Sequence, residues 1–362
     1  MLKKIVVTGG PCSGKSTALP ILADHLRSLG YNVITIPETA SDLMHSGFTP
    51  DGMNTRADFQ KLNIRFMISK MSLFEQAASG LPDGDTVMLC DRGLCDCSAY
   101  MSDGEFKDRL AECGLTKVGA RDGYDAVFHL ESAAKCAPDA YRNDDIRHES
   151  AAESAALDYA AMRAWVGNPH WRMVSDDGTG FDSKVSALLS KVTAFLGYPE
   201  PLEIERKFLI EYPDLELIKE KYICETVDIK QLYITFPNRD RTRIRKRGHG
   251  DDSVYIMTTK RKISDTVREE TETRITKEEY EEFSRYADSG RRPIVKKRTC
   301  IIANGKYFEL DIFPFWNNKA ILEIELDSED EDFTIPDEFK VIREVTSDSA
   351  YTNSAMSLKI PE

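Results

Sequence analysis

The chain has 362 residues, 41% of them hydrophobic and 30% charged, which is enough for two globular domains that each bury a core. The formal net charge of −13 argues against general binding to nucleic acid through a basic surface. No apolar run approaches the roughly 20 residues of a membrane span, and the cysteines lack metal-binding spacing. We therefore expect a cytoplasmic protein with reduced thiols and no transmembrane segment.

The first half of the chain alternates short apolar stretches with helical ones. The expected strands are Ile5–Thr8, Val33–Pro37, Thr86–Cys90, Ala126–Leu130 and Arg172–Val174. This alternation predicts an α/β domain, a parallel sheet with helices on both faces. Regular structure should stop at Gly197-Tyr-Pro-Glu-Pro201, where a glycine and two prolines interrupt it. We therefore expect domains at 1–198 and 199–362.

A phosphate-binding loop is predicted between the first strand and a helix over Ala18–Leu29. The sequence matches G-x-x-x-x-G-K-[ST] in the strand–loop–helix context that this motif requires, rather than a plain glycine-rich turn. Backbone N–H groups of such a loop turn toward the phosphates of ATP or GTP, Lys15 reaches the β/γ-phosphates, and the Ser16 hydroxyl binds Mg²⁺. The expected nucleotide-binding residues are Gly9, Gly10, Pro11, Cys12, Ser13, Gly14, Lys15, Ser16 and Thr17.

Other charged residues are expected to complete this first site. Asp91 comes just after the expected strand Thr86–Cys90, where a carboxylate can enter the Mg²⁺ shell or could simply start a loop, and Arg92 follows it. Glu38 follows the second strand and could accept a proton from a phosphate-accepting hydroxyl, or could simply begin the next helix. Arg142 and Arg147 could close on the transferred phosphate, or could belong to a solvated loop.

This half of the chain resembles the small P-loop kinases and AAA-like NTPases near ribosylnicotinamide kinase. The resemblance covers most of residues 1–190, and it implies nucleotide binding with phosphate transfer or hydrolysis. It does not identify a phosphate acceptor. The residues that carry it are Gly9–Thr17, Pro37-Glu38, Asp91-Arg92-Gly93 and Phe181-Asp-Ser-Lys184.

The second half carries charges at every second position of its expected strands, as in Glu203-Ile-Glu-Arg-Lys207 and Glu323-Ile-Glu325. Alternate residues of a strand share one face, so these charges are expected to line a common polar interior, such as the lumen of a β-barrel. An open sheet with solvated charges is the alternative. The basic set is Lys207, Arg241, Arg243, Arg245, Lys260, Lys262, Lys296 and Arg298, and the acidic set includes Glu203, Glu205, Asp311, Glu323 and Glu325.

Buried charges of both signs are costly unless they are paired, and a polyanion with divalent cations would satisfy them. Carboxylates would hold Mg²⁺ or Mn²⁺, while arginine and lysine would bind phosphate oxygens. Outside the strands, Thr276–Tyr286 is expected to be a helix, because Thr276 and Glu279 form a capping box. The acidic run Asp327–Asp332 is expected to be a solvated loop.

The charged pattern resembles the CYTH, or triphosphate tunnel metalloenzyme, superfamily over residues 202–356. The resemblance implies an antiparallel, eight-stranded β-tunnel with helices (α+β), metal-dependent hydrolysis of a triphosphate compound, and a closing lysine that could be Lys340 or Lys359. The motifs that carry it are Glu203-Ile-Glu205-Arg-Lys207, Arg243-Ile-Arg245, Thr258-Thr-Lys260, Glu270-Thr-Glu272, Lys296-Lys-Arg298, Asp311 and Glu323-Ile-Glu325. The metal ligands that it implies are Glu203, Glu205, Glu272, Asp311, Glu323 and Glu325.

The fused order of the two domains resembles plant triphosphate tunnel proteins and the TRPL translocation defect protein group, which is associated with GTP and phosphatidic acid. We expect a bifunctional enzyme acting on a nucleotide and on a triphosphate-bearing small molecule. The alternative is a nucleotide-switched binding protein whose tunnel holds a phosphorylated ligand without turnover.

Overall fold

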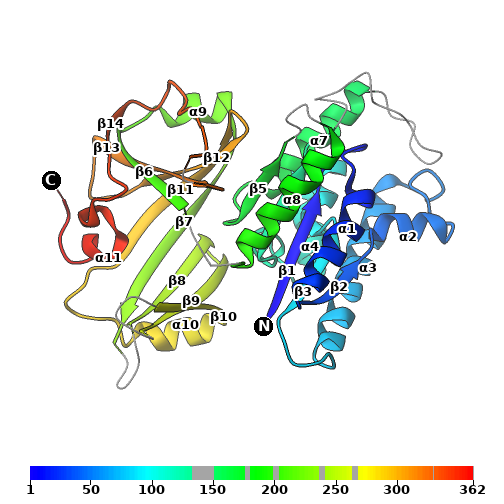
Figure 1. Ribbon diagram of the computed structural model, residues 1–362, viewed down its shortest axis with the longest axis horizontal. Helices are drawn as coiled ribbons and strands as arrows, with labels where there is room; N and C mark the ends of the chain where they lie inside the picture. The colour runs from blue at the N-terminus through cyan, green and yellow to red at the C-terminus, as the bar shows by residue number, and fades with distance from the viewer. Residues whose placement is uncertain are drawn as a thin grey trace. The chain divides into compact units, whose positions relative to one another are not determined.

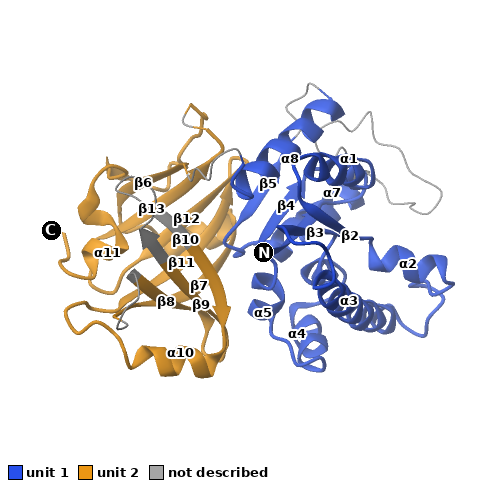
Figure 2. Ribbon diagram, turned by 60° about the horizontal axis from the view of Figure 1, so that its bottom comes forward, with its two compact units in different colours: residues 1–202 blue, residues 203–362 orange. Residues whose placement is uncertain are grey.

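A computed structural model describes residues 1–132, 151–175, 180–198, 204–235, 241–262, 268–328 and 330–361, with backbone alone at 151, 241, 260–262 and 268–270. These residues form two compact units, Met1–Leu202 and Glu203–Glu362, which are coloured separately in Figure 2. Each unit is described by itself below.

The first unit contains the parallel sheet that the sequence predicts. Its five strands run in the order β2-β3-β1-β4-β5, and every neighbouring pair is parallel. The central strands are almost completely buried, as strands with helices on both faces should be. The strands are β1 (Leu2–Thr8), β2 (Asn32–Ile36), β3 (Thr86–Asp91), β4 (Ala126–Leu130) and β5 (Trp171–Val174).

Helices cover both faces of this sheet, as expected (Figure 1). On one face, α1 and α8 pack against the strands. On the other, Met71 of α3 lies with its sulfur 3.8 Å from that of Cys90, and Asp158 of α7 contacts His129 of β4. The helical elements are α1 (Lys15–Ser28), α2 (Thr39–His45), α3 (Arg56–Ala78), η1 (Leu94–Tyr100), α4 (Asp103–Ala111), α5 (Lys117–Asp122), α7 (Ala151–Trp165) and α8 (Phe181–Phe195).

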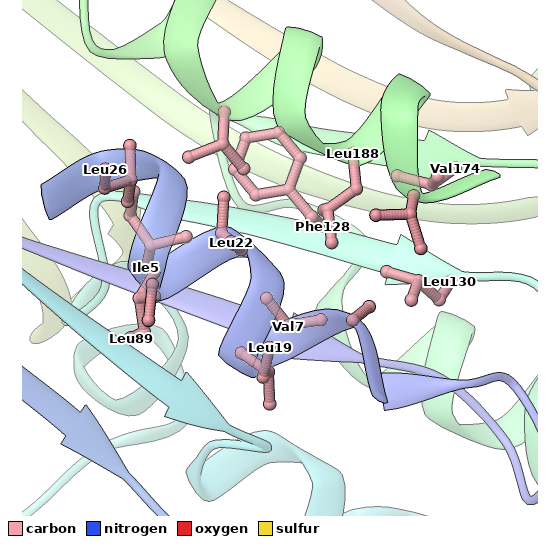
Figure 3. Packing of buried hydrophobic residues seen from close by; sticks show 14 of the residues in the cluster. Ile5, Val7, Leu19, Leu22, Leu26, Leu89, Phe128, Leu130, Val174 and Leu188 are labelled. Atoms are coloured by element: carbon pink, nitrogen blue, oxygen red, sulfur yellow. The ribbon is translucent and has the colours of Figure 1, made fainter. Parts of the chain in front are cut away.

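The core between α1, α8 and the sheet is entirely apolar (Figure 3). Ile5 and Val7 of β1 point into it together, because alternate residues of a strand share a face. Leu22 enters from α1, Leu188 from α8 and Phe128 from β4, and all of these side chains are fully buried. This packing fixes the start of α1, and with it the loop that precedes the helix.

The second unit contains one antiparallel sheet. Nine strands among the described residues run in the order β10-β9-β8-β7-β11-β12-β13-β6-β14. The antiparallel sheet was expected with eight strands, and the described residues contain one more; the shortest is β14, four residues long, which pairs with β6. The strands are β6 (Ile204–Glu211), β7 (Ile223–Ile234), β8 (Arg241–His249), β9 (Asp252–Lys262), β10 (Arg268–Ile275), β11 (Ile294–Ala303), β12 (Lys306–Ile312), β13 (Lys319–Leu326) and β14 (Val341–Glu344).

One face of the second sheet is apolar and is covered by short helices. Phe308, Leu322 and Ile324 belong to a buried cluster that Ile218 of α9 (Leu215–Lys221) joins. The helix α10 (Lys277–Ser284) packs on the strands β7 to β9 through Tyr280. It begins with the capping box expected at Thr276 and Glu279. The remaining helical pieces are η3 (Ser349–Tyr351) and α11 (Asn353–Met356).

In the described part of the chain, none of the helices is both long enough and apolar enough to cross a membrane.

The close packing of α1 generates a stability prediction. Leu22→Ala should lower the free energy of unfolding by about 2–5 kcal/mol, because it leaves a cavity among fully buried side chains. Ile21→Ala is the matched control, since Ile21 is the next residue of the same helix and is 43% exposed. Urea unfolding of both variants measures the difference. Equal losses of stability in the two variants would contradict the packing described for Figure 3.

Candidate functional site

The predicted phosphate loop connects β1 to α1 and is organised around Lys15. The Nζ atom of Lys15 donates hydrogen bonds to the carbonyl oxygens of Gly9 (2.9 Å) and Gly10 (3.2 Å) and to Oγ of Ser13 (3.0 Å). Gly14 has φ +87°, and a Cβ at this position would overlap the ring of Phe181, so both backbone and packing favour glycine. Ser16 and Thr17, the next two residues of the predicted set, are exposed in the first turn of α1, while Pro11 is buried and Cys12 is half-buried.

Asp91 lies beside this loop, at the end of β3 and in register with Val7 of β1. Its Oδ1 atom is buried and has no hydrogen-bond partner within the described structure. Burial raises the pKa of the Asp91 carboxyl, the charge of Lys15 opposes that rise, and Glu38 adds to it. A buried carboxylate oxygen without a donor is an acceptor that a hard cation can satisfy.

The buried Arg92 and the half-buried Glu38 form an ion pair next to Asp91. Arg92 donates from Nε to Oε1 of Glu38 at 2.7 Å, and Ser41 donates from Oγ to the other carboxylate oxygen at 2.6 Å. Both oxygens of the expected base are therefore engaged in this structure, and Glu38 holds Arg92 in place. Arg142 and Arg147, expected at the same site, lie outside the described residues.

The sequence did not single out Asp96 as a site residue, although it follows Arg92 closely. Its carboxylate accepts from the backbone N–H of Gly93 at 2.8 Å, from Nε1 of Trp165 at 3.1 Å and from Oγ1 of Thr8. These bonds tie η1 and α7 to the end of β1, just before the loop. This structural role of Asp96 is evident from its contacts with Thr8 and Trp165, which are distant in sequence and which no local pattern predicts.

In the second unit, the strand register places the expected charged residues on one face of the sheet. Lys207 lies opposite Glu323, Glu323 opposite Glu309, and Arg298 opposite Asp311. The same face continues over β7 to β8, β9 and β10, because the register alternates without a break. Expected site residues on this face are Glu205, Lys207, Arg241, Arg243, Arg245, Lys260, Lys262, Glu272, Lys296, Arg298, Asp311, Glu323 and Glu325; Glu203 lies outside the described residues.

Carboxylates and cations alternate closely at one side of this charged face. The Nζ atom of Lys207 lies 2.8 Å from Oε1 of Glu323 and 3.0 Å from Oε1 of Glu205. Arg298 reaches the other oxygen of Glu323 at 2.5 Å and both oxygens of Asp311 at 2.7 Å. Glu323 is thus held between two cations that come from different strands.

Two further contacts complete this acidic group. Lys296, which is 4% exposed, donates to the fully buried Asp311. Arg298 also donates to Glu309, a carboxylate that the sequence reading did not count among the site residues. Glu309 has the same strand parity as Asp311, and this spacing could have identified it. Glu325, by contrast, is exposed.

The paired charges shift the pKa values of the two glutamates in opposite directions. Burial raises the pKa of Glu205 to about 7, and the negative charge of Glu323 adds to the rise. Burial alone would also raise the pKa of Glu323, but Arg298, Lys296 and Lys207 hold it well below its usual range. At neutral pH this pair therefore consists of one carboxylate, Glu323, that is firmly charged and one, Glu205, that is only partly ionised.

Cations predominate at the other side of the charged face. Arg245 on β8 has its pKa lowered to about 10, first by burial and then by the neighbouring charge of Arg243. Glu272, expected among the metal ligands, lies here instead of with Glu205: it accepts from Oγ1 of Thr258 at 3.0 Å and is 3.6 Å from Arg243. A crowded set of cations of this kind is stabilised by binding an anion.

No group of three His, Cys, Asp or Glu side chains in the described ranges is arranged to hold a metal ion by itself. The carboxylates contact lysine or arginine instead, as Glu205 and Glu323 do with Lys207. Their oxygen donors are nevertheless of the type that Mg²⁺ and Mn²⁺ prefer.

Comparison with known proteins agrees with this geometry. Family models match an AAA domain over residues 4–180 and a CYTH domain over residues 201–349. An inorganic triphosphatase of Nitrosomonas europaea is 36% identical over 163 residues, a match that spans 44% of this chain and 99% of that protein. The chain belongs to the CYTH family. Its second unit is the CYTH domain, and the expected order of a P-loop NTPase-like domain followed by a CYTH domain is confirmed.

Solved structures are also similar to part of this chain. A crystal structure of an inorganic triphosphatase has 32% identity and a TM-score of 0.32, with 44% of this chain and 97% of that chain covered. A protein from Pyrococcus horikoshii OT3 has 21% identity and a TM-score of 0.26, with 35% of this chain and 81% of that chain covered.

The raised pKa of Glu205 in the CYTH domain generates a prediction about pH. Its folded-state pKa of about 7 exceeds the ordinary value of 4.5, so its contribution to stability is present below pH 4.5 and is lost as the pH rises through 7. In a buffer that contains a metal chelator, the melting temperature of Glu205→Gln minus that of the unmodified protein should therefore increase as the pH is raised from 5 to 8.

Glu344→Gln is the matched control for this measurement. Arg206 lowers the pKa of Glu344, so the charged form of Glu344 is already favoured throughout this pH range. If the melting temperatures of Glu205→Gln and of the unmodified protein change in parallel with pH, the pKa of Glu205 is not raised toward 7.

Proposed function

We propose that the CYTH domain hydrolyses a triphosphate compound with Mg²⁺ or Mn²⁺, and that the P-loop domain binds ATP or GTP with Mg²⁺ and transfers or hydrolyses phosphate. The observation that carries the first part is the division of one continuous sheet face. Glu205 and Glu323 gather on one side with Lys207, and Arg243 and Arg245 gather on the other. A triphosphate with a bound divalent cation matches this arrangement, because its cation would face the carboxylates and its phosphate oxygens would face the arginines.

The basic side of the face supplies the phosphate contacts in this proposal. Arg245 and Arg243 each offer several N–H donors in a planar fork, which suits phosphate oxygens. The half-buried Arg245 is crowded by Arg243, and an anion would relieve that repulsion. Arg241 and Lys260 lie opposite each other in the register of β8 and β9, and we propose that they add to the phosphate contacts.

The acidic side is the proposed metal site, with Glu205 and Glu323 as ligands. Their oxygen donors fit a hard divalent cation, which when bound supplies neutralisation of phosphate charge and a more acidic water. Lys207 now bridges these two carboxylates, and it is free to turn toward a phosphate oxygen when they bind another cation. Arg298 keeps Glu323 charged and oriented throughout, because it is itself anchored to Asp311.

The relative from Nitrosomonas europaea is an inorganic triphosphatase. We propose the same class of substrate here, tripolyphosphate, as the first compound to test. If the domain instead holds a phosphorylated ligand without turnover, the charged face remains a binding site and the protein is a nucleotide-switched binding protein.

For the P-loop domain, we propose a nucleotide site at Gly9–Thr17 with Asp91 and Ser16 as the Mg²⁺-facing groups. The orphaned Oδ1 atom of Asp91, close to Lys15, supports this assignment. Release of Lys15 from the loop carbonyls would let it reach a phosphate. Arg92, braced by Glu38, is the cation available beside that position.

Removing one charge from the acidic group tests the hydrolase proposal. Glu323→Gln should reduce the metal-dependent release of phosphate from tripolyphosphate on the order of 100-fold, because Lys207 and Arg298 lose their shared anion. Glu344→Gln is the matched control, an ion-paired but exposed glutamate of the same domain. Unchanged hydrolysis in Glu323→Gln would exclude this site as the hydrolase and favour binding without turnover.

A second substitution tests the nucleotide site separately. Lys15→Ala should weaken binding of Mg·ATP or Mg·GTP by about tenfold or more, because a charged hydrogen-bond donor to phosphate is lost. Its hydrolysis of tripolyphosphate should stay at the unmodified rate. Lys107→Ala, which removes an exposed lysine of α4, is the control in calorimetric titration. If Lys15→Ala binds nucleotide as tightly as the unmodified protein, the assignment of Gly9–Thr17 as the nucleotide-binding loop is wrong.

A further inference from the structure

Asp158 contacts the first turn of the phosphate loop from α7. Its Oδ1 atom accepts a hydrogen bond from the backbone N–H of Gly10 at 2.7 Å, and the side chain is 1% exposed. A Cβ at residue 10 would lie 2.6 Å from the Cβ of Asp158, closer than real Cβ atoms approach. Gly10 is therefore the residue that lets α7 pack directly on the loop.

The same peptide group connects Asp158 to Lys15. The N–H of Gly10 and the carbonyl of Gly9 belong to one planar peptide unit, and they point in opposite directions. The N–H bonds to Asp158, while the carbonyl accepts from Nζ of Lys15 at 2.9 Å. Rotation of this unit would break both bonds, so Asp158 determines where the loop presents the carbonyl that holds Lys15.

A second anchor holds the following residue of the loop. Ser132, just after β4, donates from Oγ to the carbonyl oxygen of Pro11. The backbone of Ser132 also contributes a hydrogen bond to Asp158. The first turn is thus held at Gly10 by an acceptor and at Pro11 by a donor, both from buried residues.

Asp158 remains charged, although it is buried near a site for anions. Burial alone would raise its pKa, but His129 and the N–H groups of Gly10 and Ser132 bring it below its ordinary value. The Nε2 atom of His129 lies 3.2 Å from Oδ1, and the imidazole is fully buried and stacked on Trp171. A carboxylate near a polyphosphate is electrostatically unfavourable, and this position is explained if an acceptor oxygen is needed there to hold the loop.

We propose that Asp158 is a positioning residue for nucleotide binding, which fixes the Gly9–Pro11 turn of the phosphate loop through the N–H of Gly10, with His129 as its buried partner. The inference rests on the proposed nucleotide site. Asp158 does not touch the nucleotide in this proposal, and it acts through the peptide unit that it shares with Lys15.

The test compares nucleotide affinity in full-length variants by calorimetric titration with Mg·ATP and Mg·GTP. Asp158→Ala should bind about tenfold more weakly, because the loop loses a charge-assisted hydrogen bond that orders it. Asp158→Asn keeps an acceptor oxygen for Gly10, and it should stay within about threefold of the unmodified protein. This rescue by the amide separates positioning from a requirement for negative charge.

Asn168→Ala is the matched control for a purely structural role. Asn168 is fully buried in the same unit, and its amide donates to the carbonyl oxygens of Arg121 and Tyr124, away from the loop. Its loss should lower the melting temperature and leave nucleotide affinity unchanged. Ser132→Ala is the second test variant if Asp158→Ala does not fold, with an expected loss of about threefold in affinity.

The outcomes separate the two levels of the proposal. The positioning role is overturned if the nucleotide affinity of Asp158→Ala stays within twofold of that of the unmodified protein. If Asp158→Ala does not fold, the same criterion applies to Ser132→Ala. The role is also overturned if Asn168→Ala loses as much nucleotide affinity as the test variant. If Lys15→Ala loses affinity in the same series, the nucleotide site itself survives that result. Absence of nucleotide binding in the unmodified protein overturns the nucleotide site, and the inference with it.

Discussion

Charge compensation between neighbouring strands is the constraint on which the CYTH domain depends. One face of its sheet is apolar and buried, so the strict alternation of a strand forces the charged residues onto the other face. There, the carboxylate of Glu323 can be buried only because Lys207 and Arg298 reach it from two different strands. The ion pairs that allow the sheet to fold are also the groups from which the proposed site is built.

In our proposal, the two domains would bind anions by different physical means. In the P-loop domain, the backbone shapes the proposed site: the loop turns at glycines, and its lysine donates hydrogen bonds to backbone carbonyl oxygens. In the CYTH domain side chains of fixed strand parity provide both signs of charge. The first arrangement depends on loop conformation, and the second depends on sheet register. A small backbone rotation would therefore disturb the former, whereas only a slip of a whole strand would disturb the latter.

The sequence predicted the features that depend on local spacing. Alternation identified the faces of strands such as β6 and β13, and the capping box located the start of α10 at Thr276. It could not predict contacts between distant residues: Asp158 is 148 positions from Gly10, and no local pattern marks it as a partner of the loop. The four-residue β14 is too short to show a period. Glu272 follows the charged alternation, yet its partners Thr258 and Arg243 place it on the basic side.

The pairing of β6 with β13 has a consequence for how the CYTH domain is made. Lys207 and Glu323 are 116 residues apart, and β6 lies between β13 and β14 in the finished sheet. During synthesis, β6 therefore leaves the ribosome long before either of its neighbours exists, and its charged and apolar faces are both without their final partners. Contacts of such long range form slowly and late. The acidic group can therefore assemble only after β13 has been synthesised, so a chain that stops before β13 lacks both the edge of the sheet and the chemistry proposed for it.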